Sequence, residues 1–147
     1  MKDIVCPHKT EIDDLMFLKG TILRIELNKI GVYVGQPVML DIINNNPGLT
    51  QKNLADIAEI KPSTVNVMLG RMAKNGLVRI EKDKYNSKLS RVFITENGNK
   101  LSKKCAKCKT EIDKIMMEGL SANEIESFKS ILSKINNNLR KQLEKEE

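Results

Sequence analysis

Cysteine and histidine side chains, the residues best suited to metal binding or thiol chemistry, fall into two short clusters. Cys6 and His8 form one cluster, and Cys105 and Cys108 form the other. A set of three cysteines and one histidine is a ligand complement that zinc accepts, and a spacing of three places Cys105 and Cys108 on one face of a helix. The same two cysteines also continue an apolar stripe, as buried cysteines commonly do. Three interpretations stay open: an inert core, a thiol redox sensor and a metal site. We assign no metal ligand and expect no cofactor.

The cysteine count and the composition limit the compartment and the class of protein. Three cysteines in 147 residues favour free thiols over a disulfide framework. No signal segment or membrane-spanning stretch is present, so we expect a cytoplasmic protein that does not bind a membrane. We do not expect an enzyme, because there is one histidine and no nucleophile with a neighbouring base.

The positive charge of the chain is concentrated in one segment. Residues 61–91 hold eight basic and two acidic side chains, whereas the other 116 residues hold 17 of each sign, so the whole formal excess of +6 lies in this segment. Such a run suits a polyanionic partner such as nucleic acid, although it also suits a solvated face.

The elements that carry this charge are predicted by periodicity and by capping residues. Apolar residues at steps of three or four predict a first helix over about 10–30, and Gln36-Pro37 opens a second, shorter helix that ends before the turn at Asn44–Gly48. Thr50 is a typical N-cap for a helix that ends near Ala58. Pro62 then opens a further helix that ends before Gly76, which makes a helix-turn-helix.

The pattern changes to a period of two after Leu77. Two alternating runs, at 78–81 and 92–95, predict the strands of a hairpin, and the polar, basic segment between them is too long for a tight turn and forms a wing. Thr95 caps a helix that continues to about Glu118, and Ser121 with Glu124 forms a capping box for the last helix. The predicted fold is mainly α with a small β-hairpin: a single domain with a winged helix-turn-helix over about 36–95, flanked by helices over about 10–31 and 97–147.

Several motifs, in order and at the right spacing, resemble the MarR-type winged-helix transcriptional regulators. The similarity spans nearly the whole chain and is sharpest from Gln36 to Leu101. The motifs are Leu54-Ala55, Pro62-Ser63-Thr64-Val65, Leu69-x-Arg71-Met72-x-x-x-Gly76-Leu77-Val78 and Ile94-Thr95-Glu96-Asn97-Gly98. At the wing tip the family commonly has Asp-x-Arg, whereas this chain has Asn86-Ser87-Lys88. Lys88 keeps the cation without the planar fork of arginine.

The recognition helix and the wing supply the candidate DNA-binding residues. If Val65, Leu69 and Met72 face inward, the polar residues on the opposite face are free to enter the major groove. Ser63 and Thr64 can alternatively serve only as helix caps, and Arg71 suits a phosphate or a guanine. The expected DNA-binding residues are Ser63, Thr64, Asn66, Val67, Arg71, Lys84, Lys88 and Arg91.

The resemblance implies a two-fold dimer formed by the first and last two helices. It would set the recognition helices about one DNA turn apart on a pseudo-palindromic operator. The function we expect is a ligand-responsive repressor, with double-stranded DNA, a second copy of the chain and a small-molecule effector as partners. The alternatives are a thiol-redox or metal-sensing regulator on the same scaffold, and a winged-helix module that binds proteins instead of DNA.

Overall fold

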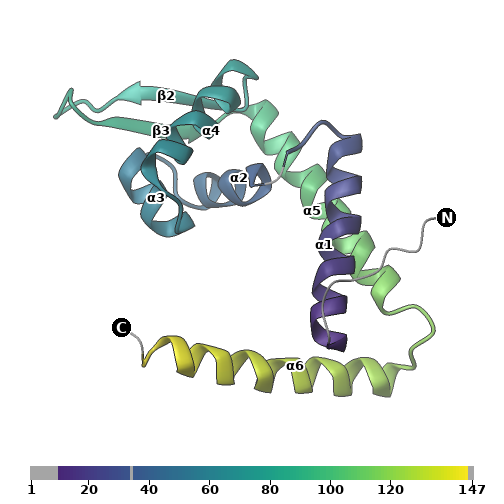
Figure 1. Ribbon diagram of the computed structural model, residues 1–147. Coiled ribbons are helices and arrows are strands. Elements are labelled where there is room, and N and C mark those ends of the chain that lie inside the picture. Colours follow the sequence, from purple (N-terminus) through teal and green to yellow (C-terminus); the bar gives the residue numbers. More distant parts are fainter. Residues whose placement is uncertain (1–9, 34, 146–147) are drawn as a thin grey trace. The chain divides into compact units, whose positions relative to one another are not determined.

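The computed structural model describes residues 10–33 and 35–145 (Figure 1). The chain forms two compact units, Met1–Ile112 and Asp113–Glu147. That the chain is a single domain, with a winged part over about 36–95 between flanking helices, stays a prediction. The elements in chain order are α1 (Glu11–Lys29), α2 (Gln36–Asn45), β1 (Leu49–Thr50), α3 (Gln51–Ala58), α4 (Pro62–Lys74), β2 (Val78–Lys82), β3 (Ser90–Ile94), α5 (Glu96–Met116) and α6 (Ala122–Leu143).

The helices begin at the residues that the capping pattern predicts. The Thr50 hydroxyl accepts a hydrogen bond from the Asn53 amide at 3.2 Å and so caps α3. Pro37 and Pro62 lie in the first turns of α2 and α4, where the missing N–H of proline costs nothing. One boundary differs from the expectation, because α2 continues through Asn45 and the turn starts one residue later.

The sheet has three antiparallel strands in the order β1-β3-β2, whereas the sequence suggested only a hairpin. The added strand, β1, is two residues long, with Leu49 opposite Val92 and Thr50 opposite Arg91. The hairpin itself has Val78 opposite Ile94. A strand of two residues shows no alternation, which is why periodicity missed β1.

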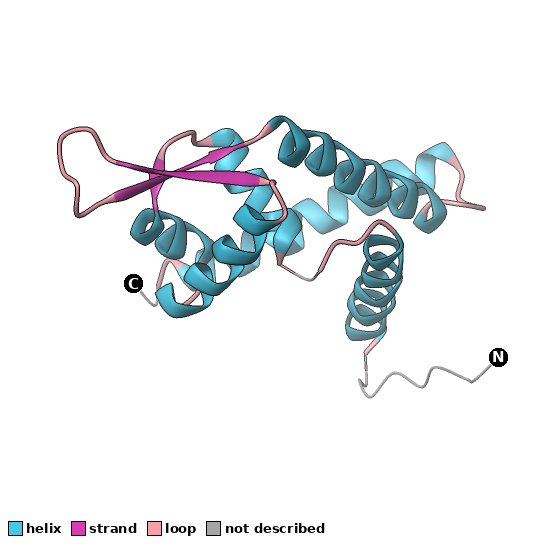
Figure 2. Ribbon diagram, turned by 90° about the horizontal axis from the view of Figure 1, so that it is seen from above, coloured by secondary structure: helices cyan, strands magenta, loops and turns pink. Residues whose placement is uncertain are grey.

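The hydrophobic core of the first unit lies between the helix-turn-helix and the sheet. Met39, Leu40 and Ile43 of α2 pack with Leu54 of α3 and with the inward faces of α4, β2 and β3. Figure 2 shows the hairpin crossing beside these helices and its loop extending beyond them. The core therefore holds α4 and the base of the wing in one packed body.

The start of α5 is fixed against the base of the hairpin. The Thr95 hydroxyl accepts from the Gly98 amide at 3.0 Å, as the sequence predicts for a cap, and donates to the Gly76 carbonyl at 2.6 Å. The Thr95 amide donates to the Leu77 carbonyl at 3.0 Å. Gly98 lies against this carbonyl so closely that an added Cβ would be 2.0 Å from the Leu77 oxygen.

Further along, α5 packs on α1 and is tied to α2. Leu27 and Val32 form a small apolar cluster with Cys105. The Asp41 carboxylate on α2 accepts a hydrogen bond from the Ser102 hydroxyl at 3.1 Å. It also forms an ion pair with the Lys109 ammonium group at 3.1 Å.

The second unit is dominated by α6. Ser121 and Glu124 form the predicted capping box. None of the residues of α6 is buried, and Ile131, Leu139 and Leu143 are all more than half exposed. Among the described residues, no helix combines the length and the apolar character that a membrane span requires.

Candidate nucleic-acid interface

The recognition helix α4 separates an apolar face from a polar one. Val65, Leu69 and Met72 are fully buried in the core, as the sequence predicts. The opposite face begins at the first turn and is exposed to solvent along its length. It carries Ser63, Thr64, Asn66, Val67, Gly70 and Arg71.

The hydroxyls at the start of α4 do not cap the helix. The N-cap is Lys61, whose backbone carbonyl accepts from the amides of Thr64 and Val65, and no side chain caps this end. Within the described residues, neither Ser63 nor Thr64 uses its hydroxyl in a hydrogen bond. These groups are therefore available to an external partner.

The turn that precedes α4 is stabilised by backbone contacts. Glu59 ends α3 in the left-handed conformation, with φ at 53°, and the Ile60 amide donates to the Ala55 carbonyl. Ile60 packs against the core, so the turn holds α4 in position through both hydrogen bonds and apolar contact.

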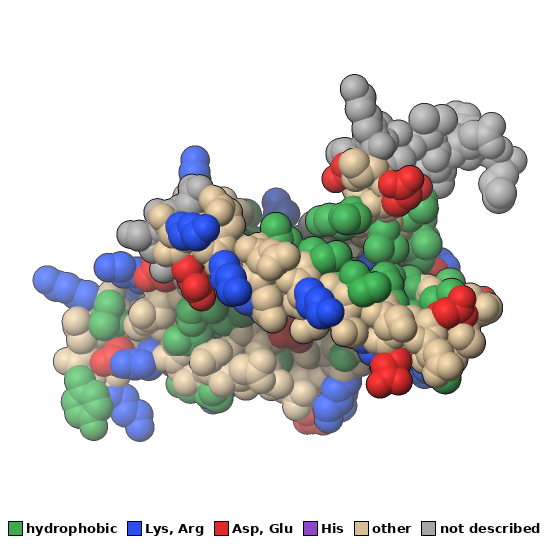
Figure 3. Space-filling view, turned by 90° about the horizontal axis from the view of Figure 1, so that it is seen from below, with side chains coloured by type: hydrophobic (Ala, Val, Ile, Leu, Met, Phe, Trp, Pro, Cys, Tyr) green, Lys and Arg blue, Asp and Glu red, His purple; other side chains and the backbone are tan. Residues whose placement is uncertain are grey.

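The wing presents cations and one aromatic ring to solvent. Lys82, Lys84 and Lys88 are exposed, and Tyr85 is 98% exposed. Figure 3 shows lysine and arginine side chains projecting around the wing end of the molecule, on the left. Residues from opposite ends of the wing segment thus form one positively charged tip.

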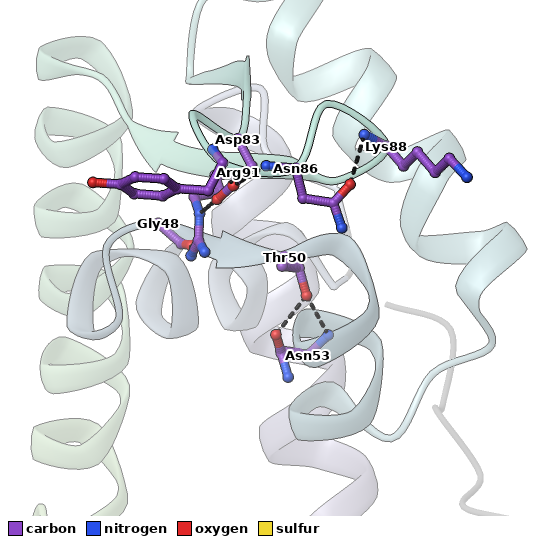
Figure 4. Close-up of polar contacts among 8 residues, drawn as sticks. Gly48, Thr50, Asn53, Asp83, Asn86, Lys88 and Arg91 are labelled. Atoms are coloured by element: carbon purple, nitrogen blue, oxygen red, sulfur yellow. Dashed lines mark hydrogen bonds and ion pairs between the residues drawn. The ribbon is translucent and has the colours of Figure 1, made fainter.

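Arg91, which is expected to contact DNA, takes part in a network of hydrogen bonds at the base of the wing (Figure 4), and its side chain is 44% exposed. Its Nε atom forms an ion pair with the Asp83 carboxylate, and its Nη1 atom donates to the Gly48 carbonyl at 2.8 Å. The other oxygen of Asp83 accepts from the amides of Tyr85 at 2.9 Å and Asn86 at 2.8 Å.

This network keeps the Asp83 side chain ionised. The hydrogen bond from Arg91 is the largest cause that lowers the pKa of the Asp83 carboxyl below its ordinary value, and the two backbone amides lower it further. The Asp83 side chain is only 6% exposed although the loop around it is open to solvent. A buried carboxylate with three donors is a fixed point in an otherwise exposed segment.

A second arginine on the hairpin is also engaged within the protein. The Arg79 guanidinium lies 4.5 Å from the centre of the Phe93 ring and forms an ion pair with Glu81. Arg79 and Phe93 lie opposite each other on β2 and β3, so this contact links the two strands.

The candidate DNA-binding residues therefore lie in two groups, with Arg91 apart from both. Those on α4 share one exposed helix face, Lys84 and Lys88 share the wing tip, and Arg91 lies at the wing base. Sequence reasoning missed Asp83 and Gly48 as parts of this region. The only signal for Asp83 was an acidic residue in a strongly basic segment.

Cys105 and Cys108 lie on α5, in or against the apolar cluster with Leu27 and Val32, and this packing favours a core role. Cys105 is buried, and its desolvation is the main cause that raises the pKa of its thiol. A raised pKa lowers the thiolate fraction on which redox reactivity depends. Cys6 and His8 lie outside the described residues. Among the described residues, no cluster of three or more His, Cys, Asp or Glu side chains is arranged to hold a metal ion.

Comparison with known proteins agrees with this architecture. The model of the MarR family matches residues 33–89. The chain is 30% identical over 102 residues to the transcriptional regulator HosA of Escherichia coli, covering 69% of this chain and 76% of HosA. It is 25% identical over 125 residues to the HTH-type transcriptional repressor Rv2887 of Mycobacterium tuberculosis, covering 82% of this chain and 90% of that protein.

Solved structures share the fold at lower identity. A MepR variant from S. aureus, solved bound to an oligodeoxyribonucleotide, superposes with a TM-score of 0.68 at 20% identity, covering 87% of this chain and 94% of MepR.

Proposed function

Because the chain belongs to the MarR family and is a DNA-binding transcriptional regulator, not an enzyme, we propose that it acts as a dimeric, ligand-responsive repressor. In this proposal the dimer binds a pseudo-palindromic operator in the cytoplasm and leaves it when a small molecule binds. Its relative Rv2887 is a transcriptional repressor, which supports repression instead of activation.

The observation that carries the proposal is the free polar face of α4. An α-helix fits the major groove, and hydroxyl and amide groups near its N-terminus can hydrogen-bond base edges. We assign base reading to Ser63, Thr64 and Asn66, and contact with a thymine methyl group to Val67. Arg71 binds a phosphate or a guanine from the same face.

The wing supplies the second contact. Lys84 and Lys88 project from its tip, and cations at this position neutralise phosphates next to the groove that α4 enters. A MepR variant with the same fold was solved bound to an oligodeoxyribonucleotide, which supports DNA as the partner in this proposal.

The dimer is proposed from the apolar faces of the flanking helices, over about 10–31 and 97–147. Ile12, Met16 and Ile25 on α1 are exposed, as are Ile131 and Leu139 on α6. Exposed apolar stripes of this length are typical of interfaces. A two-fold dimer places two copies of α4 on half-sites about one helical turn apart.

The test is selection of duplexes from a random-sequence pool by the full-length chain, followed by fluorescence anisotropy with the selected duplex and with an unselected duplex. We expect enrichment of an inverted repeat. Thr64→Ala and Asn66→Ala should each weaken binding to the selected duplex by about 1–3 kcal/mol and leave the unselected duplex nearly unaffected.

Two outcomes would contradict this proposal. Equal losses on both duplexes would assign Thr64 and Asn66 to positioning instead of sequence reading. A wild-type chain that enriches no sequence and binds duplex DNA no better than a neutral protein would favour a protein-binding module.

A further inference from the structure

We propose that Asp83 and Arg91 are positioning residues of the DNA interface: together they hold the wing tip in one conformation and tie it to the chain that enters the helix-turn-helix at Gly48. This inference rests on the proposed DNA-binding function and deepens it. It assigns to Arg91 a role different from the DNA contact that its charge suggests. We call the contacts among Asp83, Arg91 and Gly48 the wing clamp.

The first part of the clamp fixes the shape of the loop. The Asp83 carboxylate accepts the amides of Tyr85 and Asn86, and the Asp83 amide donates to the Leu89 carbonyl at 3.0 Å. The loop is therefore closed across its own base, with the buried carboxylate at its centre. Lys84 and Lys88 extend from this closed frame.

The second part connects the wing to the helix-turn-helix. Gly48 is 43 residues from Arg91 in sequence, and its carbonyl accepts the Arg91 Nη1 donor while its amide donates to the Val92 carbonyl at 3.0 Å. Two residues after Gly48, Thr50 caps α3. The clamp thus sets the position of the wing relative to the start of the helix-turn-helix.

Gly48 is suited to this contact because any other residue would be strained in its backbone conformation and would crowd the Phe93 ring. Its φ of 81° lies in the left-handed region, and an added Cβ would lie 3.3 Å from the Phe93 ring atom Cε1. The backbone of Gly48 can therefore approach β3 closely enough for Arg91 to reach its carbonyl.

The chemistry of the clamp requires arginine at position 91. The guanidinium uses Nε for Asp83 and Nη1 for Gly48, two donors in a fixed planar arrangement that lysine lacks. The carboxylate also neutralises the Arg91 charge. Arg91 is a weak phosphate ligand in this state, and the unpaired lysines at the tip are better ones.

Asp83→Asn tests the clamp because charge and geometry predict opposite effects. Asparagine keeps an acceptor for the two amides but presents N–H groups to Arg91, so the ion pair is lost. Removing a negative charge near DNA would by itself tighten binding. We expect about tenfold weaker binding to the selected duplex instead, because the wing is no longer held.

The matched control is Glu81→Gln, which removes the same charge from the same hairpin outside the clamp. It should leave affinity unchanged or slightly higher. Binding by Asp83→Asn that is as tight as wild type, or tighter in parallel with Glu81→Gln, would overturn the proposal.

Arg91→Lys keeps the positive charge at position 91 but removes the planar guanidinium group with its Nε and Nη1 donors. We expect it to weaken binding about as much as Arg91→Gln, whereas equal affinity of Arg91→Lys and wild type would show that only the charge matters.

In the Asp83→Asn background, Lys88→Ala should cost less affinity than in wild type, because a released wing no longer presents Lys88. Additive losses would assign Asp83 a general stabilising role and contradict the clamp.

A measurement without DNA keeps the clamp distinguishable from the proposed function. Amide hydrogen exchange by NMR should be slow at Tyr85 and Asn86 in the wild-type chain and faster in Arg91→Lys, with core amides of α4 unchanged. Slow exchange in both proteins would contradict the clamp even if DNA binding is confirmed. Clamp-dependent exchange in a chain that binds no DNA would contradict only the proposed function.

Discussion

The lowered pKa of the Asp83 carboxyl predicts that the stability of the protein depends on pH in an acidic window. Because its pKa is lowered in the folded chain, its contribution is fully present above the unfolded value of about 3.9 and is lost as the pH falls through the lower folded value. We expect Asp83→Asn to be less stable than wild type at neutral pH and the difference to shrink below about pH 4. Urea unfolding at a series of pH values measures this. A difference that is constant across the series would contradict it.

Gly98 is a position at which an added Cβ atom is expected to lower the stability of the fold. An alanine Cβ would lie 2.0 Å from the Leu77 oxygen and 2.8 Å from the Ile94 side chain, so the backbone must move. Gly98→Ala should lower the free energy of unfolding by at least about 1–3 kcal/mol.

Gly70→Ala is the matched control for Gly98→Ala. Gly70 also lies in a helix, but a Cβ added there would meet no neighbouring atom within 4 Å, so alanine should stabilise the chain by about 0.5–1 kcal/mol. Denaturant unfolding without DNA compares the two, and losses of equal size would show that Gly98 tolerates a side chain.

At the scale of elements, the wing is expected to act as an electrostatic contact. If Lys88 neutralises one phosphate, Lys88→Ala should flatten the slope of log affinity against log salt by about 0.9. Lys134→Ala on α6 removes the same charge from a helix that the proposal places in the dimer and should leave the slope unchanged. Anisotropy titrations at several salt concentrations measure both, and an unchanged slope for Lys88→Ala would remove Lys88 from the interface.

The elements that sequence predicts best are those specified by neighbouring residues. Three helix starts are marked by the caps Thr50, Thr95 and Ser121, because a cap acts within three residues of itself. A fourth is marked by Pro62, because the fixed φ of proline suits a first helical position. The buried face of α4 follows from the spacing of its apolar residues.

The parts that sequence did not predict depend on contacts between distant residues. Strand β1 exists because it pairs with β3, more than 40 residues later, and two residues carry no period of their own. Arg91 was classed with the other cations because residue type gives its charge, whereas its partners Asp83 and Gly48 are known only after the chain has folded. The free hydroxyls of Ser63 and Thr64 likewise became clear only when Lys61 proved to be the N-cap.

At the scale of the molecule, α6 should determine assembly. No residue of this helix is buried, and its apolar side chains at about 25 cal/mol per Å² would contribute several kcal/mol if a second copy covered them. Deleting residues from Ile135 onward should dissociate the dimer at micromolar concentration while the winged domain stays folded. Operator affinity should fall because the half-sites are no longer bound by linked subunits.

Sedimentation of three chains checks this: the full-length protein, the truncated protein and a control that lacks only residues 144–147, which follow α6. We expect the control to remain dimeric. A full-length monomer that binds a two-half-site operator tightly would contradict both the dimer and the palindrome.

The hydrogen bonds around Thr95 have a mechanical consequence. The end of α4, the first residues of the hairpin and the first turn of α5 meet where Thr95 contacts Gly76 and Leu77, and Gly98 leaves no space between helix and carbonyl. Because no space is left between them, α5 and the end of α4 are expected to move as one rigid body. In the proposed dimer, a tilt of α5 is therefore expected to move α4 and the wing together and to change the distance between the two recognition helices.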